Sequence, residues 1–160
     1  MLLITIVVGL VIWYTYFDWP PSDQRLIGVF QKNRKVFDAL QQDICSLSES
    51  QTIMKQPSWS RPVVSDEVRQ KYYRLLRVIN ATGISSIKNR HGIDCAVVIE
   101  VWARGTIFSA DYKKYTYNMS THPDELMVDT LDNLTLDPNK IQFFRRNIGG
   151  GWALEYAHWP

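Results

Sequence analysis

Histidine and cysteine are the side chains in this sequence best suited to catalysis or metal binding, and they are few. The histidines are His91, His122 and His158, and the cysteines are Cys45 and Cys95. No two histidines stand four residues apart, as they do on a zinc-binding helix, and no cysteine or carboxylate stands at ligand spacing beside them. The sequence therefore predicts no metal site and no cofactor.

Two roles for the cysteines remain open. Cys95 and His158 would form a nucleophile and its base if their strands were neighbours in space. Alternatively, Cys45 and Cys95 form a disulfide in an exported domain, or stay as small buried thiols in the cytoplasm. No motif accompanies Cys95, so a structural role is favoured over a catalytic one.

Carboxylate and nucleotide chemistry have less support. Asp94 and Glu100 lie on one side of a predicted strand, about 20 Å apart, which is too far for an acid–base pair. The acidic residues after Pro123 lack the alternate spacing and glycine bend of a calcium loop. No G-x-S-x-G, P-loop or dinucleotide fingerprint occurs. An enzyme of unrecognised type is therefore an alternative to the first hypothesis, a non-catalytic protein.

Composition narrows the class of partner. The formal net charge is +2, which argues against a nucleic acid as the main ligand. The chain has 6 Trp and 8 Tyr, so a small domain either packs a ring-rich core or presents a ring-lined surface.

Three Asn-x-Ser/Thr triplets begin at Asn80, Asn118 and Asn133, and chance alone accounts for about one.

The first stretch of the chain, residues 1–17, is uncharged and almost wholly apolar. As a helix it would span roughly 26 Å, near the short limit for a bilayer, and the aromatic residues between Trp13 and Trp19 would form an interfacial belt. Bulky side chains stand where a signal peptidase needs small ones. We therefore expect an uncleaved transmembrane anchor over residues 1–19, rather than a removed signal peptide or a buried core helix.

This anchor predicts an inner-membrane protein with a single span. A near-terminal anchor favours a periplasmic domain. The alternative is a cytoplasmic domain, because basic residues from Arg25 to Lys35 follow the anchor.

Residues 22–160 then form a single extramembrane domain. Apolar residues at steps of three and four predict two amphipathic helices, at 23–45 and from Ser65 to about Ile79. Residues 46–64 are predicted as a loop, and a short helix is predicted from Pro123. Alternating and β-branched runs predict strands near 93–102, 106–119, 141–148 and 152–159. The fold class is thus α+β, with a transmembrane helix and two helices packed on a mainly antiparallel sheet of four to five strands.

The closing hairpin carries a weak resemblance. Its residues follow the pattern F-x-R-x-I…W-x-L-x-Y, at Phe144, Arg146, Ile148, Trp152, Leu154 and Tyr156. This pattern resembles small bacterial envelope proteins, some of which are immunity proteins that block a toxic effector. The resemblance implies a binding protein and identifies no functional residue.

The first hypothesis is accordingly a membrane-anchored module that binds another protein, such as a toxin or an envelope component. Rings dominate interface energetics, so the predicted contact residues are aromatic: Trp59, Tyr112, Tyr115, Tyr117 and Trp159. The alternative, besides an enzyme, is a structural subunit that oligomerises through the helix at 23–45.

Overall fold

The computed structural model describes residues 19–55, 58–88, 95–105 and 110–160. These residues form three helices and eight strands: α2 (Asp23–Lys32), α3 (Arg34–Ser46), β1 (Thr52–Met54), β2 (Trp59–Arg61), α4 (Asp66–Val78), β3 (Gly83–Ile87), β4 (Ala96–Gly105), β5 (Ala110–Tyr117), β6 (Glu125–Met127), β7 (Gln142–Gly149) and β8 (Trp152–Trp159).

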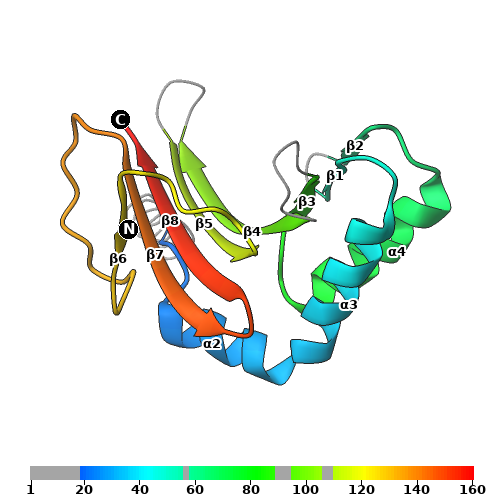
Figure 1. Ribbon diagram of the computed structural model, residues 1–160, viewed down its shortest axis with the longest axis horizontal. Coiled ribbons are helices and arrows are strands. Elements are labelled where there is room, and N and C mark those ends of the chain that lie inside the picture. Colours follow the sequence, from blue (N-terminus) through cyan, green and yellow to red (C-terminus); the bar gives the residue numbers. More distant parts are fainter. Residues whose placement is uncertain (1–18, 56–57, 89–94, 106–109) are drawn as a thin grey trace, which may run out of the picture.

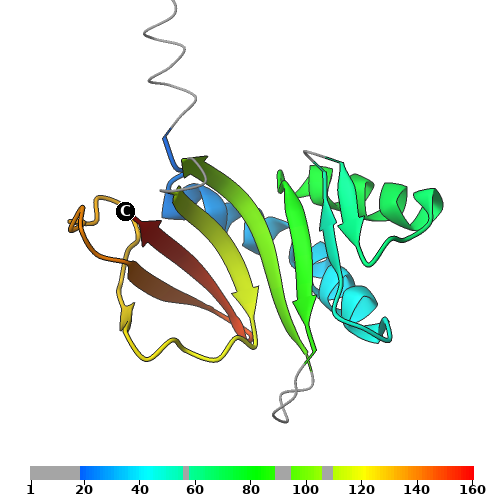
Figure 2. The same ribbon diagram turned by 90° about the horizontal axis from the view of Figure 1, so that it is seen from above.

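The strands form one mixed sheet in the order β2-β1-β3-β4-β5-β8-β7-β6. Neighbouring strands are antiparallel except β6 and β7, which run parallel. All three helices lie on one face of the sheet (Figure 1, Figure 2). We name the other side the helix-free face. The crossing segment, residues 118–124, leads from β5 to β6 and passes in front of β8 and β7 in Figure 1.

Local sequence explains where the helices begin and break. The hydroxyls of Ser22 and Ser65 cap α2 and α4 by accepting a hydrogen bond from a backbone N–H three residues on, each at 3.4 Å. Asn33 ends α2, and its side-chain amide donates to the Val29 carbonyl at 2.9 Å. The predicted helix at 23–45 is therefore two helices. Its apolar stripe is buried against the sheet of the same chain.

The centre of the core is a group of four rings. Phe30 and Phe37 from the helices meet Tyr115 of β5 and Trp152 of β8, with ring centroids 4.7 to 6.4 Å apart. Aromatic pairs at these distances add to the free energy gained by burial alone. This cluster packs α2 and α3 against the middle of the sheet.

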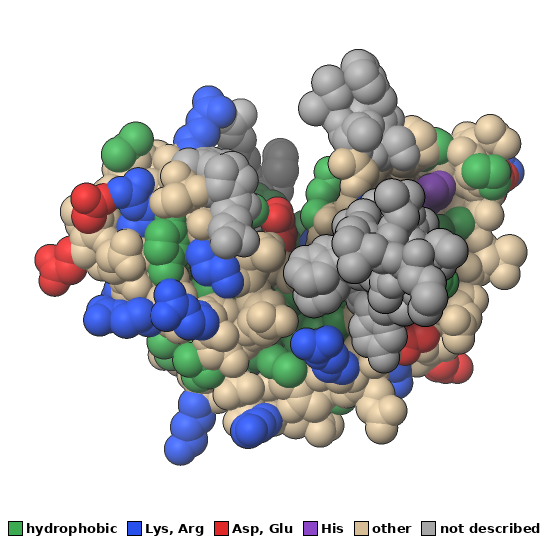
Figure 3. All heavy atoms as spheres, turned by 180° about the vertical axis from the view of Figure 1, so that it is seen from behind, with side chains coloured by type: hydrophobic (Ala, Val, Ile, Leu, Met, Phe, Trp, Pro, Cys, Tyr) green, Lys and Arg blue, Asp and Glu red, His purple; other side chains and the backbone are tan. Residues whose placement is uncertain are grey.

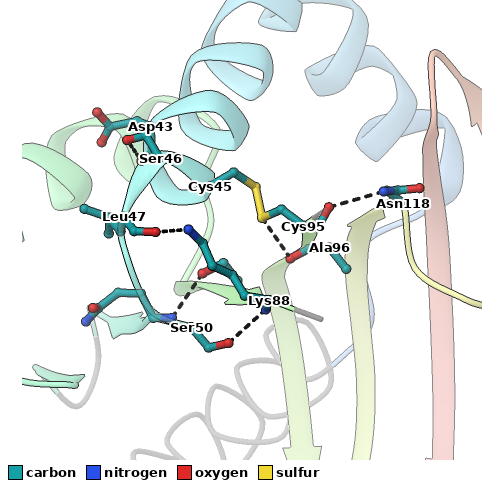
Figure 4. The surroundings of a disulfide bond; sticks show 11 residues. Asp43, Cys45, Ser46, Leu47, Ser50, Lys88, Cys95, Ala96 and Asn118 are labelled. Atoms are coloured by element: carbon teal, nitrogen blue, oxygen red, sulfur yellow. Dashed lines mark hydrogen bonds between the residues drawn. A yellow bond between two sulfur atoms is a disulfide. The ribbon is translucent and has the colours of Figure 1, made fainter. Parts of the chain in front are cut away.

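A disulfide joins the end of α3 to the start of β4, between Cys45 and Cys95 (Figure 4). Nearby, Lys88 donates to the Leu47 carbonyl and, through its backbone N–H, to the Ser50 hydroxyl at 2.8 Å. The amide of Asn118 donates to the Cys95 carbonyl at 3.4 Å. In the chain-entropy model, closing a loop of this length contributes about 4 kcal/mol to stability.

The predicted fold class is wrong in the extent and type of its sheet. The sheet has eight strands rather than four or five and contains a parallel pair, and three helices cover it rather than two. Strands β1 and β2 lie in residues 46–64, which were predicted to be a loop. They are three residues each, too short to show the alternation that marks a strand.

The predicted helix after Pro123 is also wrong, because residues 125–127 form β6. Glu, Leu and Met favour helices by intrinsic propensity. Here the parallel pairing with β7 decides the conformation instead. Intrinsic preference is a weak guide where a neighbouring strand supplies the hydrogen bonds.

The membrane prediction also needs correction. None of the helices in the described part of the chain is both long enough and apolar enough to cross a bilayer. Of the predicted anchor, residues 1–18 lie outside the described residues. A single-span inner-membrane protein is therefore not supported.

The three asparagines that begin the Asn-x-Ser/Thr triplets share one backbone feature. Asn80, Asn118 and Asn133 have φ values of 54°, 49° and 60°, in the left-handed region. Asparagine tolerates this region better than other residues with a side chain. Turn geometry alone therefore explains an asparagine at each of these positions.

Candidate interaction surface

Alternate residues of the central strands point to opposite faces of the sheet. Tyr115 of β5 points toward the helices, and its hydroxyl donates to the Leu26 carbonyl of α2 at 2.7 Å. Its neighbours Lys114 and Thr116 therefore point to the helix-free face. The same alternation places Phe143 and Arg145 of β7, and the cross-strand partners of all these residues, on that face.

Four large apolar side chains gather at one end of the helix-free face. We name them the aromatic patch: Tyr112, Ile141, Phe143 and Trp159. Tyr112 is 36% exposed, Trp159 43% and Ile141 50%, while Phe143 is half-buried. Singly exposed apolar residues are ordinary, but a contiguous group of them indicates a contact surface.

The strand register holds the aromatic patch together. Ala157 of β8 lies directly between Tyr112 and Phe143, and its small side chain leaves room for both rings. The rings of Phe143 and Trp159 meet edge to face at 5.9 Å, and His122 from the crossing segment lies 4.6 Å from Phe143. Because three paired strands carry these rings, little conformational entropy is lost when a partner binds them.

A row of alternating charges borders the aromatic patch. Glu100 of β4, Lys114 of β5, Glu155 of β8 and Arg145 of β7 are successive cross-strand neighbours. Glu155 lies 3.2 Å from the Lys114 ammonium and 3.0 Å from Nε of Arg145, and it accepts from the Thr116 hydroxyl at 2.8 Å. We name these four residues, together with Glu125 of β6, the charge ladder.

Arg145 connects the charge ladder to the crossing segment. Its Nε lies 3.3 Å from Glu125, and another of its nitrogens donates to the Met119 carbonyl at 3.1 Å. Arg145, Glu155 and Thr116 are all buried. The ladder thus fixes the segment that overlies it and separates the aromatic patch from the polar end of this face.

The carboxyl groups of the charge ladder differ in the direction in which their pKa is shifted. Burial alone would raise the pKa of Glu155, but Lys114, Arg145 and Thr116 together hold it below its ordinary value. Burial raises the pKa of Glu125, and the negative charge of Glu155 raises it further. Oε2 of Glu125 has no hydrogen-bond partner among the described residues. Burial also raises the pKa of Glu100.

A second charged cluster lies on the helix-bearing face, and we name it the helix-side cluster: Asp23, Lys113, Asp132 and Arg146. The Lys113 ammonium is fully buried and lies 2.8 Å from Asp23, 3.0 Å from Asp132 and 2.8 Å from the Pro21 carbonyl. Arg146 lies 2.8 Å from the other oxygen of Asp23. Two anions and two cations neutralise one another here, so the cluster attaches the start of α2 to the sheet.

The structure separates the five aromatic residues predicted to bind a partner. Tyr112 and Trp159 lie in the aromatic patch. Tyr115 lies in the core and is not available to a partner, and its burial raises the pKa of its hydroxyl. Tyr117 is half-buried, with its ring 5.2 Å from that of Trp152. Trp59 belongs to β2, at the far edge of the sheet from this region, and its side chain lies outside the described residues.

Sequence reasoning missed Ile141, Phe143 and His122. Ile141 and Phe143 alternate in a strand that the sequence did predict, so their common face was available from the pattern. Their position beside Trp159 depends on the register of β7 on β8. His122 comes from a connection whose path over the sheet has no signature in the sequence.

The arrangements proposed for catalysis are not assembled. Cys95 is half of a disulfide and has no thiol to offer. His158 lies at the opposite end of the sheet, where its Nδ1 is 2.6 Å from Asp111. His91 lies outside the described residues. Within the described ranges, no three residues among His, Cys, Asp and Glu are placed to hold a metal ion.

The helix-bearing face is a weaker candidate for binding. Figure 3, seen from behind Figure 1, shows basic side chains spread over the end of the molecule that carries α3 and α4. On α4, Lys71 pairs with Asp43 at 2.6 Å and Arg69 pairs with Asp66. Val78 is the only large apolar residue exposed on α4, all of which is described. Such a surface is typical of a solvated helix.

Comparison of the chain with protein-family models, curated proteins and solved structures finds no match.

Proposed function

We propose that the protein is a non-catalytic binding module that holds a protein partner through the aromatic patch. The observation that carries the proposal is the contiguity of Tyr112, Phe143 and Trp159 on paired strands of the helix-free face, with Ile141 directly before β7. Tyrosine and tryptophan are the side chains most enriched among residues that dominate binding free energy. Each such ring buries about 150–250 Å² when covered.

The border of the patch supports this proposal. Productive interfaces surround buried rings with polar groups that exclude water and set the orientation of the partner. The charge ladder supplies such a border on one side, and His122 supplies another. An immunity protein that blocks a toxic effector is the form that the resemblance of the closing hairpin favours.

Site-specific photo-crosslinking tests the proposal. A photoreactive phenylalanine analogue would replace Trp159 or Tyr112 in the full chain, expressed in its own host. We expect one discrete cross-linked product from both positions. The control position is Val63, which is 90% exposed and belongs to β2's side of the sheet. Equal products from all three positions, or none from the patch, would refute the proposal.

Alanine substitutions then measure the contribution of each ring to affinity for the captured partner. Trp159→Ala and Tyr112→Ala should each weaken binding by about tenfold or more, because ring truncation at an interface centre costs at least about 1–2 kcal/mol. Ile87→Ala is the matched control, since Ile87 is a similarly exposed apolar residue on β3. We expect it to change affinity less than about twofold.

A further inference from the structure

The sheet ends in an edge that is only partly covered. β6 pairs with Phe143, Phe144 and Arg145 of β7, and the chain then leaves the sheet after Val128. β7 continues to Gly149, so its second half extends past the end of β6 (Figure 1). On the side away from β8, residues 146–149 therefore have no strand beside them among the described residues.

The hydrogen bonds of β6 show which groups of this edge face outward. Val128 donates through its backbone N–H to the Arg145 carbonyl at 2.9 Å. The backbone N–H and C=O of Arg145 therefore point toward β6 rather than toward β8. Residues two apart in a strand point their backbone groups to the same side. The N–H and C=O of Asn147 therefore face outward, and no described residue pairs with them there.

Hollows lie on both sides of this edge. On the helix-free face, a hollow of about 350 Å³ is lined by Thr116, Asn118 and Asn147, together with the apolar residues Met119, Trp152 and Ala153. On the other face, a hollow of about 510 Å³ separates Arg146 from Gln24, Gly28 and Gln31 of α2. A Cβ added at Gly28 would meet nothing within 4 Å, so this side of α2 is open.

An edge strand beside a helix, with space on both faces, is suited to strand addition. An extended peptide adds its backbone to the edge, and its side chains alternate between the two faces. We propose that residues 146–149 of β7 receive an extended segment of a partner protein as an added strand. The small hollow on the helix-free face favours a short side chain such as Ser, Thr or Asn, and Gln24, Gln31 and Arg146 on the other face favour a polar one.

An extended segment fits this edge better than a second copy of the chain. The register between β7 and β8 shifts between Asn147 and Gly149, which marks a bulge. A bulge bends and twists its strand, so two rigid copies of this edge cannot lie flat against each other. An unfolded segment can follow the bend. The inference is independent of the aromatic patch, which lies at the other end of β7.

The decisive variant is Asn147→Pro. Proline removes the outward N–H and is tolerated at an edge position whose N–H does not bond to the neighbouring strand. The probe would be peptides selected from a phage-displayed library of short unstructured sequences on the full chain. We expect Asn147→Pro to weaken their binding about tenfold, since both the hydrogen bond and the close approach are lost. Asn147→Ala, which keeps the N–H, is the matched control and should change affinity about twofold or less.

A second measurement leaves the protein unchanged. N-methylation of the one peptide residue that pairs with Asn147 should abolish binding, whereas N-methylation of its two neighbours should not, and amide exchange of Asn147 should slow when the peptide is bound. Four outcomes would overturn the inference: no enriched peptide, equal binding to Asn147→Pro, insensitivity to N-methylation, or pairing of two copies through β7 in sedimentation. Peptides that lose affinity with Trp159→Ala but not with Asn147→Pro would assign binding to the aromatic patch instead.

Discussion

Lys113 and Lys114 are consecutive residues of β5, and Arg145 and Arg146 are consecutive residues of β7, yet each pair divides between the two faces of the sheet. Lys113 and Arg146 belong to the helix-side cluster and meet Asp23. Lys114 and Arg145 belong to the charge ladder and meet Glu155. The same residue types on the same strands thus build two ionic clusters with different surroundings.

The two clusters differ in their balance of charge. The helix-side cluster joins two carboxylates to two cations. Burial alone would raise the pKa of Asp23, but the Leu131 N–H, Lys113 and Arg146 together hold it below its ordinary value. The charge ladder joins three carboxylates, those of Glu100, Glu125 and Glu155, to two cations. A balanced cluster thus fixes the chain, whereas a surplus carboxyl group in a buried site favours its protonated form.

Removing the central cation of the helix-side cluster should have the largest effect. Lys113→Met leaves Asp23 and Asp132 facing each other without the buried ammonium. We expect the free energy of unfolding to fall by about 3–5 kcal/mol, as for other buried pairs that lose one partner. Urea denaturation followed by circular dichroism measures this loss.

The neighbouring lysine is the matched control. Lys114→Met leaves Glu155 paired with Arg145, and Lys114 is itself partly exposed to solvent. Its loss should cost about 1 kcal/mol or less. Equal losses for the two lysines would mean that the clusters do not differ as described.

Removing the central cation of the charge ladder should have an intermediate and local effect. Arg145→Met leaves the Met119 carbonyl without its donor and Glu125 and Glu155 without the guanidinium. We expect a loss of about 2–3 kcal/mol, smaller than for Lys113 because Glu125 can take up a proton. Hydrogen exchange in the crossing segment should become faster, which mass spectrometry of peptides covering 118–128 would detect.

Arg146→Met serves as the comparison for that experiment. Asp23 keeps Lys113, and the ion pair of Arg146 is made with Asp23 rather than with the crossing segment. Exchange in residues 118–124 should therefore match that of the unmodified chain. Faster exchange in both variants would indicate a general loss of stability rather than release of this segment.

The smallest expected effect on stability is that of Glu125, and it depends on pH in a defined direction. Its pKa in the folded chain lies above its ordinary value of 4.5, so the folded chain holds this proton more tightly than the unfolded chain. Its contribution to stability therefore falls as pH rises from 4.5 through the folded pKa. Glu125→Gln should remove this fall and leave stability at neutral pH equal to that of the unmodified chain, or higher by up to about 1 kcal/mol.

The contribution of Asp23 to stability changes with pH in the opposite direction. Its folded pKa lies below the ordinary value of 3.8, so its contribution is present above that pH and is lost as pH falls through the folded pKa. Unfolding measurements on Asp23→Asn and Glu125→Gln between pH 3 and pH 8 compare the two. If Glu125→Gln were destabilising at neutral pH, the Glu125 carboxylate would be a favourable partner of Arg145 rather than a surplus group.

The alternation within single strands was the most predictable feature of these clusters. The sequence placed Tyr115 and Lys114 on opposite sides of one strand, and it predicted the hairpin of β7 and β8. It did not show which side the helices cover. The sequence predicted only that a helix begins at Asp23, whereas the Asp23 carboxylate pairs with residues 90 and 123 positions away.

Short elements and long-range pairings account for most of what the sequence did not reveal. β1, β2 and β6 owe their conformation to neighbouring strands. The aromatic patch depends on the register of three strands and on a connection that crosses them. Two of its four members, Tyr112 and Trp159, were predicted because they are large rings in strands. Ile141 and Phe143 could be assigned to the patch only from the register of β7 on β8.

The bond between Cys45 and Cys95 divides the polypeptide into a closed ring and two tails. The ring contains β1, β2, α4 and β3, while α2 and the strands from β4 to β8 belong to the tails. After a single proteolytic cut within the ring, the two pieces stay joined through the disulfide, and no fragment separates on a denaturing gel until a reductant is added. A cut in either tail releases a fragment at once. Gel electrophoresis with and without reductant therefore tells on which side of this covalent boundary a protease has acted.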